Sequence, residues 1–148
     1  MAFSSIPSTY TDLCLKVSAR NTNASVSDWI NIQFNSSTTG YSYRLLQGSG
    51  TTANSYNGSS QYSGDIDSAN ATASTFGSYE LYLPNYAGSN YKSYSVDSVV
   101  ENNATYAESN LLAGLLSNTA AISSVTVSPR NGTFVQYSTA TLYGIKNS

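Results

Sequence analysis

The sequence predicts an all-β protein, a single antiparallel β-sandwich of jelly-roll type with about eight strands. Segments in which apolar and polar residues alternate recur along the chain, and this pattern is typical of half-buried strands. Most connections between these segments are short and polar, and no long segment has a convincing helical period. At 148 residues the chain has the size of one domain, so we expect residues 1–148 to form a single sandwich.

The composition indicates an ordered chain with an almost uncharged surface. Charged residues make up 9% of the chain, against about 25% in typical globular proteins, and the net charge is −2. Disordered chains tend to lack aromatic residues and to carry high net charge, whereas this chain has 13 Tyr. A low net charge also favours association. We therefore expect a β-rich domain that packs among copies of itself.

Three strands are expected in the first third of the sequence, within YTDLCLKVSAR (10–20), DWINIQFN (28–35) and YSYRLLQ (41–47). In each segment every second residue is apolar and falls on one face. These residues are Leu13, Leu15 and Val17, then Ile30, Ile32 and Phe34, then Tyr41, Tyr43 and Leu45.

Two further strands are expected within SYELYLP (78–84) and YKSYSVDSVV (91–100). Their aligned residues are Tyr79, Leu81 and Leu83, then Tyr94, Val96 and Val100. Pro84 ends the first of these strands, because its ring nitrogen cannot donate a ladder hydrogen bond.

The segment 108–116 is either a strand or a short turn of helix. Its leucines, Leu111, Leu112, Leu115 and Leu116, fit a helical spacing. Gly114 opposes a helix, because it costs about 1 kcal/mol relative to Ala.

The last two strands are expected within AISSVTVSP (121–129) and STATLYGI (138–145). Asn131-Gly132 lies between them and is a turn-favouring dipeptide, so the two strands are expected to pair. The first and last strands of the sandwich would then lie near the two ends of the sequence.

Residues 48–75 are expected to form one long surface loop. Ile66 is the only aliphatic residue larger than Ala in this stretch of Gly, Ser, Thr and Asn, so little of it can be buried. Loops beyond about 12–15 residues are usually functional or extended over a surface. Asp65 and Asp67 offer oxygen ligands of the kind that Ca²⁺ takes. No EF-hand spacing surrounds them, which favours a solvated loop.

Three segments resemble a recurrent domain of tailed-bacteriophage virion proteins: FSSIPSTYTDLCLKVSAR, FNSSTTGYSYRLL and AISSVTVSPRNGTFVQYSTATLYGIK. That group has an Ile-Pro-x-x-Tyr-x-x-Leu opening, an Asn-x-x-x-x-x-Tyr segment and a terminal Leu-Tyr-Gly-Ile. The matching residues here are Ile6, Pro7, Tyr10 and Leu13, then Asn35 and Tyr41, then Leu142, Tyr143, Gly144 and Ile145. The resemblance spans nearly the whole chain. It implies a structural role in head or tail, a homotrimer with its sandwiches side by side, and no catalytic residues.

Catalysis is not expected from the residues themselves. The chain has no His, which excludes Ser-His-Asp and Cys-His arrangements and imidazole metal ligands. Cys14 lies near Lys16, which lowers a thiol pKa, but no partner base accompanies it. A glycosidase pair among the scattered carboxylates depends on their separation in space. These carboxylates are Glu80, Asp97, Glu101 and Glu108. We expect no enzyme, no cofactor and no metal.

Contacts with partners are expected from two groups of residues. Cys14, Trp29 and Tyr82 alternate out of the main apolar faces of their strands. Four tyrosines lie in or beside expected loops, where their rings either pack on a partner protein, stack on a sugar or fill a sandwich face. These are Tyr56, Tyr62, Tyr86 and Tyr91.

The function expected from these observations is that of a non-enzymatic structural protein of a tailed-phage virion. We favour an outer capsid decoration or cement subunit that packs on other virion proteins. One alternative is a tail-fibre or tail appendage domain that binds host-surface glycan, and another is a hydrolase of surface polysaccharide. A fibre is usually attached through a dedicated N-terminal segment or a coiled coil, and no heptad pattern appears.

Other partners and locations are disfavoured by the sequence. The six cations are scattered singly and form no basic stripe, so nucleic acid is not an expected partner. No apolar run approaches the ~20 residues of a membrane span, and no signal peptide is visible. We expect synthesis in the host cytoplasm and a final location on the outer surface of the phage particle.

Overall fold

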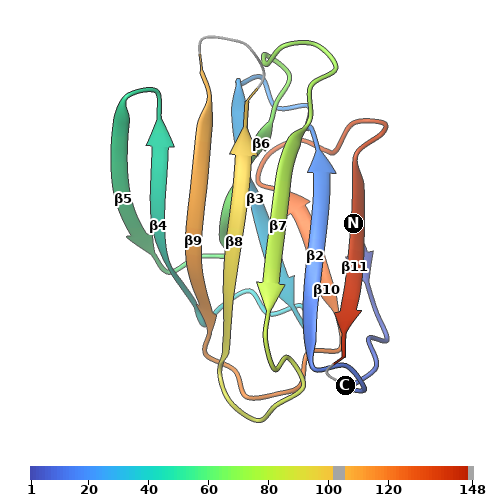
Figure 1. Cartoon of the computed structure of the whole chain (residues 1–148). Helices are drawn as coiled ribbons and strands as arrows, with labels where there is room; N and C mark the ends of the chain where they lie inside the picture. The colour runs from blue at the N-terminus through green and yellow to red at the C-terminus, as the bar shows by residue number, and fades with distance from the viewer. Residues whose placement is uncertain (102–105, 147–148) are drawn as a thin grey trace.

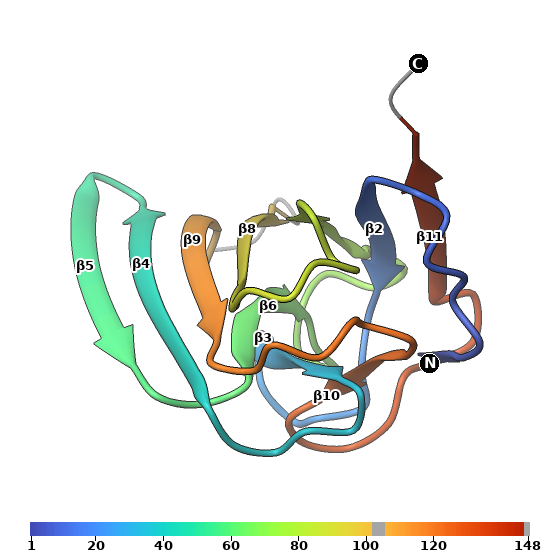
Figure 2. The same cartoon turned by 90° about the horizontal axis from the view of Figure 1, so that it is seen from below.

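A computed structural model of the chain describes residues 1–101 and 106–146. It is a β-sandwich of eleven strands in two sheets, and every pair of neighbouring strands is antiparallel. No helix occurs among the described residues. The two sheets stack face to face, as Figures 1 and 2 show from the side and from below.

The two sheets differ in width. The smaller sheet has the order β1 (Ala2–Phe3), β10 (Val125–Pro129), β3 (Ser27–Phe34), β6 (Tyr62–Asp67). The larger sheet has the order β11 (Thr139–Ile145), β2 (Asp12–Ala19), β7 (Gly77–Leu83), β8 (Lys92–Val100), β9 (Glu108–Leu116), β4 (Tyr41–Ser49), β5 (Thr52–Gly58). The first strand thus lies at an edge of one sheet and the last strand at an edge of the other.

The core lies between the sheets and follows the alternation of the sequence. Strand β8 alternates between buried and exposed side chains through all nine of its residues. Strand β7 does the same, with Tyr79, Leu81 and Leu83 buried. From the opposite sheet, Ile30 and Ile32 are fully buried against them. The strands expected from alternating residues are therefore confirmed.

Residues 108–116 form strand β9, so the helical alternative is wrong. Asn110, Leu112, Gly114 and Leu116 point into the core while Ser109, Leu111 and Ala113 are exposed. Gly114 lies opposite Tyr94 of β8, and a Cβ atom at Gly114 would come within 2.2 Å of the Tyr94 ring. The glycine that opposes a helix thus makes room for an aromatic ring.

The expected surface loop at 48–75 is wrong, because this stretch contains β5 and β6. Every residue of β6 is buried, since the strand pairs with β3 and also packs on β7, β8 and β9. Its small residues permit this close approach. At Gly64 (φ 142°), an added Cβ would lie 2.6 Å from the Ser98 hydroxyl oxygen. With β5, β6 and the short β1, residues 1–101 and 106–146 form eleven strands in place of about eight.

Residues 68–76, between β6 and β7, form a loop that is held by Arg20. The buried Arg20 guanidinium donates from Nη1 to the carbonyl oxygens of Thr72 (2.8 Å) and Thr75 (3.2 Å). Its Nη2 donates to the carbonyl oxygens of Ala69 (3.1 Å) and Ala71 (3.0 Å). Arg20, directly after β2, thereby fixes a loop in which Phe76 is the only apolar side chain larger than a methyl group.

The expected pairing of the last two strands is also wrong, because β10 and β11 belong to different sheets. The chain turns at Asn131-Gly132, where Gly132 has a φ of 67°. Asn131 donates from its backbone N–H to Asp28 Oδ2 (3.0 Å) and from Nδ2 to Asp28 Oδ1 (3.1 Å). These bonds tie the turn to β3 and lead the chain across to the other sheet. Jelly-roll connectivity is not confirmed by this strand order.

The hairpin β4–β5 extends beyond the width of the smaller sheet, as Figure 2 shows. Only Asn54 and Gly58 of β5 are half-buried, and its other residues are exposed. The larger sheet is therefore left uncovered on its whole outer side and, near β5, on part of its inner side.

Gly114→Ala is expected to lower the free energy of unfolding by roughly 1–3 kcal/mol, because the new methyl group overlaps the Tyr94 ring. Gly48→Ala in β4 is the matched control, since a Cβ there meets no atom within 4 Å. The control is expected to change stability by less than about 0.5 kcal/mol. Urea unfolding of the two variants measures both values, and equal losses would contradict the packing of Tyr94 on Gly114.

Candidate functional site

An open groove lies on the inner side of the overhanging hairpin β4–β5, beside the smaller sheet. Its volume is about 310 Å³. The residues that line it, here called the aromatic groove, are Trp29, Tyr43, Leu45, Gln47, Tyr56, Asn57 and Tyr62. They come from β3, β4, β5 and β6, so both sheets contribute to the groove.

The aromatic rings of the groove are packed against one another. The ring centroids of Trp29 and Tyr62 are 4.9 Å apart in an edge-to-face arrangement, and those of Tyr43 and Tyr62 are 5.1 Å apart. The Arg130 guanidinium lies 4.1 Å from the Trp29 ring centroid, within cation–π range. Trp29 and Tyr56 stay 39% and 47% exposed. The groove thus offers two aromatic rings to solvent, and the Trp29 ring is held in place by Tyr62 and Arg130.

Strand geometry explains why these side chains meet. Trp29 lies between the buried residues Asp28 and Ile30 and so points out of the core. The pairing of β3 with β6 is irregular, with Gly64 opposite Ile30 and Tyr62 opposite Asn31. A bulge of this kind re-aims a side chain, and Tyr62 here reaches both the groove and the polar interior.

A buried polar network lies behind the groove. Tyr62 donates its hydroxyl proton to Asp65 Oδ2 (2.5 Å), which also accepts from Asn110 Nδ2 (3.1 Å). Gln47 donates from Nε2 to Glu108 Oε2 (2.8 Å). Asp65 and Glu108 are nearly inaccessible to solvent, so neither carboxyl group can touch a substrate in this conformation. The network therefore positions Tyr62 and Gln47, which line the groove.

Burial governs the protonation of this network. Removal from water and the negative charge of Glu108 together raise the pKa of Asp65 to about 7, against the opposing effect of the hydrogen bond from Tyr62. Burial also raises the pKa of Glu108, against hydrogen bonds from Tyr106 and Asn110. The pKa values of both carboxyl groups are thus raised above those of exposed carboxyl groups.

A second surface is the solvent side of the larger sheet, here called the outer face. One row across its seven strands is Thr141, Lys16, Glu80, Asp97, Leu111, Leu46 and Ser55, and all seven are exposed. Lys16 Nζ and Glu80 Oε2 form an ion pair at 2.8 Å. Toward β4 and β9 the row becomes apolar, with Leu46 and Leu111 58% and 59% exposed.

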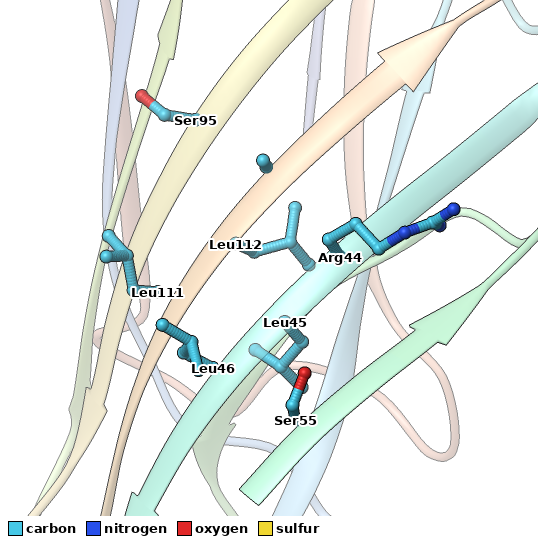
Figure 3. A pocket seen from close by; sticks show the side chains of 8 residues that line it. Arg44, Leu45, Leu46, Ser55, Ser95, Leu111 and Leu112 are labelled. Carbon is cyan, nitrogen blue, oxygen red and sulfur yellow. The ribbon is translucent and has the colours of Figure 1, made fainter.

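A shallow hollow of about 370 Å³ lies where β4 and β9 meet on the outer face (Figure 3). The residues that line it are Arg44, Leu45, Leu46, Ser55, Ser95, Leu111, Leu112 and Ala113. Two consecutive leucines in each strand explain its apolar character. Because successive side chains of a strand point to opposite faces, Leu45 and Leu112 enter the core and Leu46 and Leu111 remain outside.

The structure brings together three of the residues expected to contact partners. Trp29, Tyr56 and Tyr62 all line the aromatic groove, although Tyr62 is itself almost fully buried. Tyr43 and Gln47 line the same groove but were not among the residues expected to contact partners. Tyr43 and Gln47 alternate with Leu45 along one strand, which indicates that the three share a face. Nothing in the sequence showed that the smaller sheet ends beside them.

Two more of the expected residues are neighbours on the outer face. Cys14 pairs with Tyr82 on one side and with Tyr143 on the other. Burial, together with the charge of Glu80, raises the pKa of the Cys14 thiol, which keeps it protonated and unreactive. Tyr82 remains partly exposed and donates its hydroxyl proton to Asp12 Oδ2 (2.7 Å).

The remaining two expected contact residues belong to neither surface. Tyr86 is fully buried and donates its hydroxyl proton to the carbonyl oxygen of Pro7, so the prediction that it contacts a partner is wrong. An aromatic residue just after the end of a strand here closes the core. Tyr91 is exposed but lines neither the groove nor the hollow.

The carboxylates considered from the sequence are also placed. Asp65 and Asp67 are buried in β6, so the solvated loop expected around them is wrong. Among the residues that the structure describes, no three Cys, Asp or Glu side chains lie close enough together to hold a metal ion. Glu80 and Asp97 are neighbours across β7 and β8 on the outer face, whereas Glu108 points into the interior.

Comparisons of the chain with protein-family models, with curated proteins and with solved structures found no match. The described part of the chain contains no helix with the length and hydrophobicity that a membrane span requires. Any function must therefore be argued from the groove and the outer face themselves.

The free energy of unfolding is expected to fall as the pH rises from about 4 to about 7. Asp65 has a pKa of about 7 in the folded protein and 3.8 as an unperturbed group, so the folded state binds more protons over this interval. One such proton gives a slope of at most about 1.4 kcal/mol per pH unit. Urea unfolding at several pH values measures it.

Asp65→Asn is the test of this assignment. Asparagine can still accept hydrogen bonds from Tyr62 and Asn110 but cannot ionise. The variant is therefore expected to fold and to show a flatter pH dependence over the same interval. A parent protein whose stability rises between pH 4 and 7 would contradict the protonated state of Asp65.

Proposed function

We propose that the protein is a non-enzymatic structural component of a tailed-phage virion, an outer capsid decoration subunit that packs on neighbouring virion proteins. The observation that supports this proposal best is the uncovered outer face of the seven-stranded sheet. Seven strands present there a surface built mainly of small, uncharged side chains. The resemblance of the sequence to tailed-phage virion domains supports the proposal that this surface is used in a phage particle.

The apolar part of the outer face has the properties of an interface. Leu46 and Leu111 lie directly opposite each other in register, and each leaves more than half of its surface in water. Contiguous exposed apolar patches on a folded protein commonly mark sites of interaction. The core of a protein interface is also depleted of charged residues. Here Arg44 is the only charged residue among those that line the hollow.

The charges of the outer face lie beside its apolar part. Lys16 and Glu80 form an ion pair across β2 and β7. Asp97 lies between this pair and the leucines, directly opposite Leu111. A polar rim beside an apolar centre is the usual anatomy of an interface. We propose that Leu46 and Leu111 form this centre in a homotrimer or against the capsid shell. A position in the tail in place of the head would use the same face.

The double variant Leu46→Glu/Leu111→Glu is expected to fold but to lose both self-association and incorporation into particles, because it places two charges in the apolar centre. Tyr137→Glu is the control, since Tyr137 is 78% exposed in the connection before β11 and lies outside the outer face. Analytical ultracentrifugation measures the oligomeric state. Electron microscopy of particles with added protein shows whether copies cover the shell or only the tail. A parent protein that is monomeric at micromolar concentration and does not bind particles contradicts the proposal.

A further inference from the structure

We propose that the aromatic groove binds a neutral oligosaccharide, with Tyr56 as the ring on which a sugar unit stacks. This site is separate from the outer face and adds a binding activity to the structural role proposed above. The groove lies on the opposite side of strand β4 from the exposed leucines, so the two surfaces can be occupied together.

The shape of the groove suits a chain ligand. Its volume of about 310 Å³ is at the lower end of the range for small-molecule sites. It is open to solvent along the overhanging hairpin, so a longer chain can pass through with one or two units in contact. Tyr56 stands on the overhanging strand β5 and Trp29 on the smaller sheet, which places aromatic surface on two walls.

The polar groups of the groove match sugar chemistry. A pyranose ring carries C–H groups on its faces and hydroxyl groups around its edge, and each hydroxyl both donates and accepts hydrogen bonds. Aromatic rings cover the apolar faces of such a ligand, while side-chain amides can both donate and accept at its edge. Gln47 supplies one such amide, and the phenol groups of Tyr43 and Tyr56 supply hydroxyls.

The charge of the groove selects a neutral ligand. Among the residues that line it there is no Lys, Arg, Asp or Glu. Single-stranded nucleic acid also stacks on aromatic rings, but its backbone requires a positively charged groove. The protein carries a net charge of −2, which further disfavours a polyanion. Arg130 does not line the groove but lies against the Trp29 ring.

The groove is fixed before a ligand arrives. Arg130 and Tyr62 hold the Trp29 ring, and the bond from Tyr62 to Asp65 anchors Tyr62 in turn. Gln47 is anchored to Glu108 through Nε2, and its amide oxygen is an additional acceptor. Groups held in this way lose little conformational freedom on binding, which increases affinity for a given set of contacts.

The fluorescence of the protein reports on this site directly, because Trp29 is the only tryptophan in the chain. The probes are hexasaccharides of β-1,4-linked glucose, α-1,4-linked glucose and β-1,4-linked N-acetylglucosamine. At least one of them is expected to change the Trp29 emission saturably at concentrations up to the millimolar range. Failure of all three to change the emission overturns the proposal, whatever the oligomeric state or the position in the particle.

Three variants test the role of Tyr56. Tyr56→Ala is expected to weaken binding roughly tenfold or more, because the stacking ring is lost. Tyr56→Phe keeps the ring and is expected to bind within a few-fold of the parent. Tyr91→Ala is the matched control, since Tyr91 is exposed and lies outside the groove. Equal binding by the Tyr56→Ala variant and the parent overturns the proposal.

A proline-rich peptide is the competing ligand, because proline-rich segments also dock in aromatic grooves. The groove favours the sugar, since the Gln47 amide and the hydroxyl groups of Tyr43 and Tyr56 offer donors and acceptors together, whereas the carbonyl groups of a polyproline chain accept only. A decaproline peptide titrated in the same assay is expected to leave the Trp29 emission unchanged. Saturable binding of this peptide without binding of any hexasaccharide would assign the groove to a protein partner and overturn the proposal.

Discussion

The difference in width between the two sheets is the constraint on which both candidate surfaces depend. A four-stranded sheet cannot cover a seven-stranded one, so the hairpin β4–β5 has no strand facing its far edge. The aromatic groove forms where the smaller sheet stops. The larger sheet has no layer on its other side at all, which leaves Leu46 and Leu111 in solvent. A second sheet of equal width would remove the groove and leave an ordinary sandwich.

Strand β6 makes this arrangement possible, because it is an edge strand of the smaller sheet and lies close to the larger sheet. Apart from Tyr62 and Ile66 its residues are small or polar, and the core contact at Gly64 requires the absence of a side chain. The cost is a set of polar groups with no access to water, which must find partners inside. Asp65 finds two of them, in Tyr62 and Asn110. The same hydrogen bonds that satisfy the interior therefore also stiffen the groove.

The sequence predicted the strands that bury one face and expose the other, because such strands alternate with a period of two. It failed for β6, which is buried on both faces and in which four of the six residues are Gly, Ser or Asp, residues that are typical of loops. It also failed at Asn131-Gly132, because turn propensity shows where a chain reverses and not which sheet it enters next. Trp29 and Tyr56 were identified as contact residues. Their neighbours Tyr43 and Gln47 were not, since groove membership depends on where the opposite sheet ends.

The pairing of distant segments has a consequence for how the chain folds during synthesis. Strand β2 requires β11, strand β1 requires β10, and the amino group of Met1 donates to the carbonyl oxygen of Val127, 126 positions away. Proteins dominated by such non-local pairings fold slowly, in milliseconds to seconds. At roughly 5–20 residues per second, a ribosome needs on the order of ten seconds to reach these partners. Until then β2 exposes an unpaired edge. The nascent chain therefore depends on its polar segments, which have a low propensity to form strands, or on chaperones to avoid aggregation.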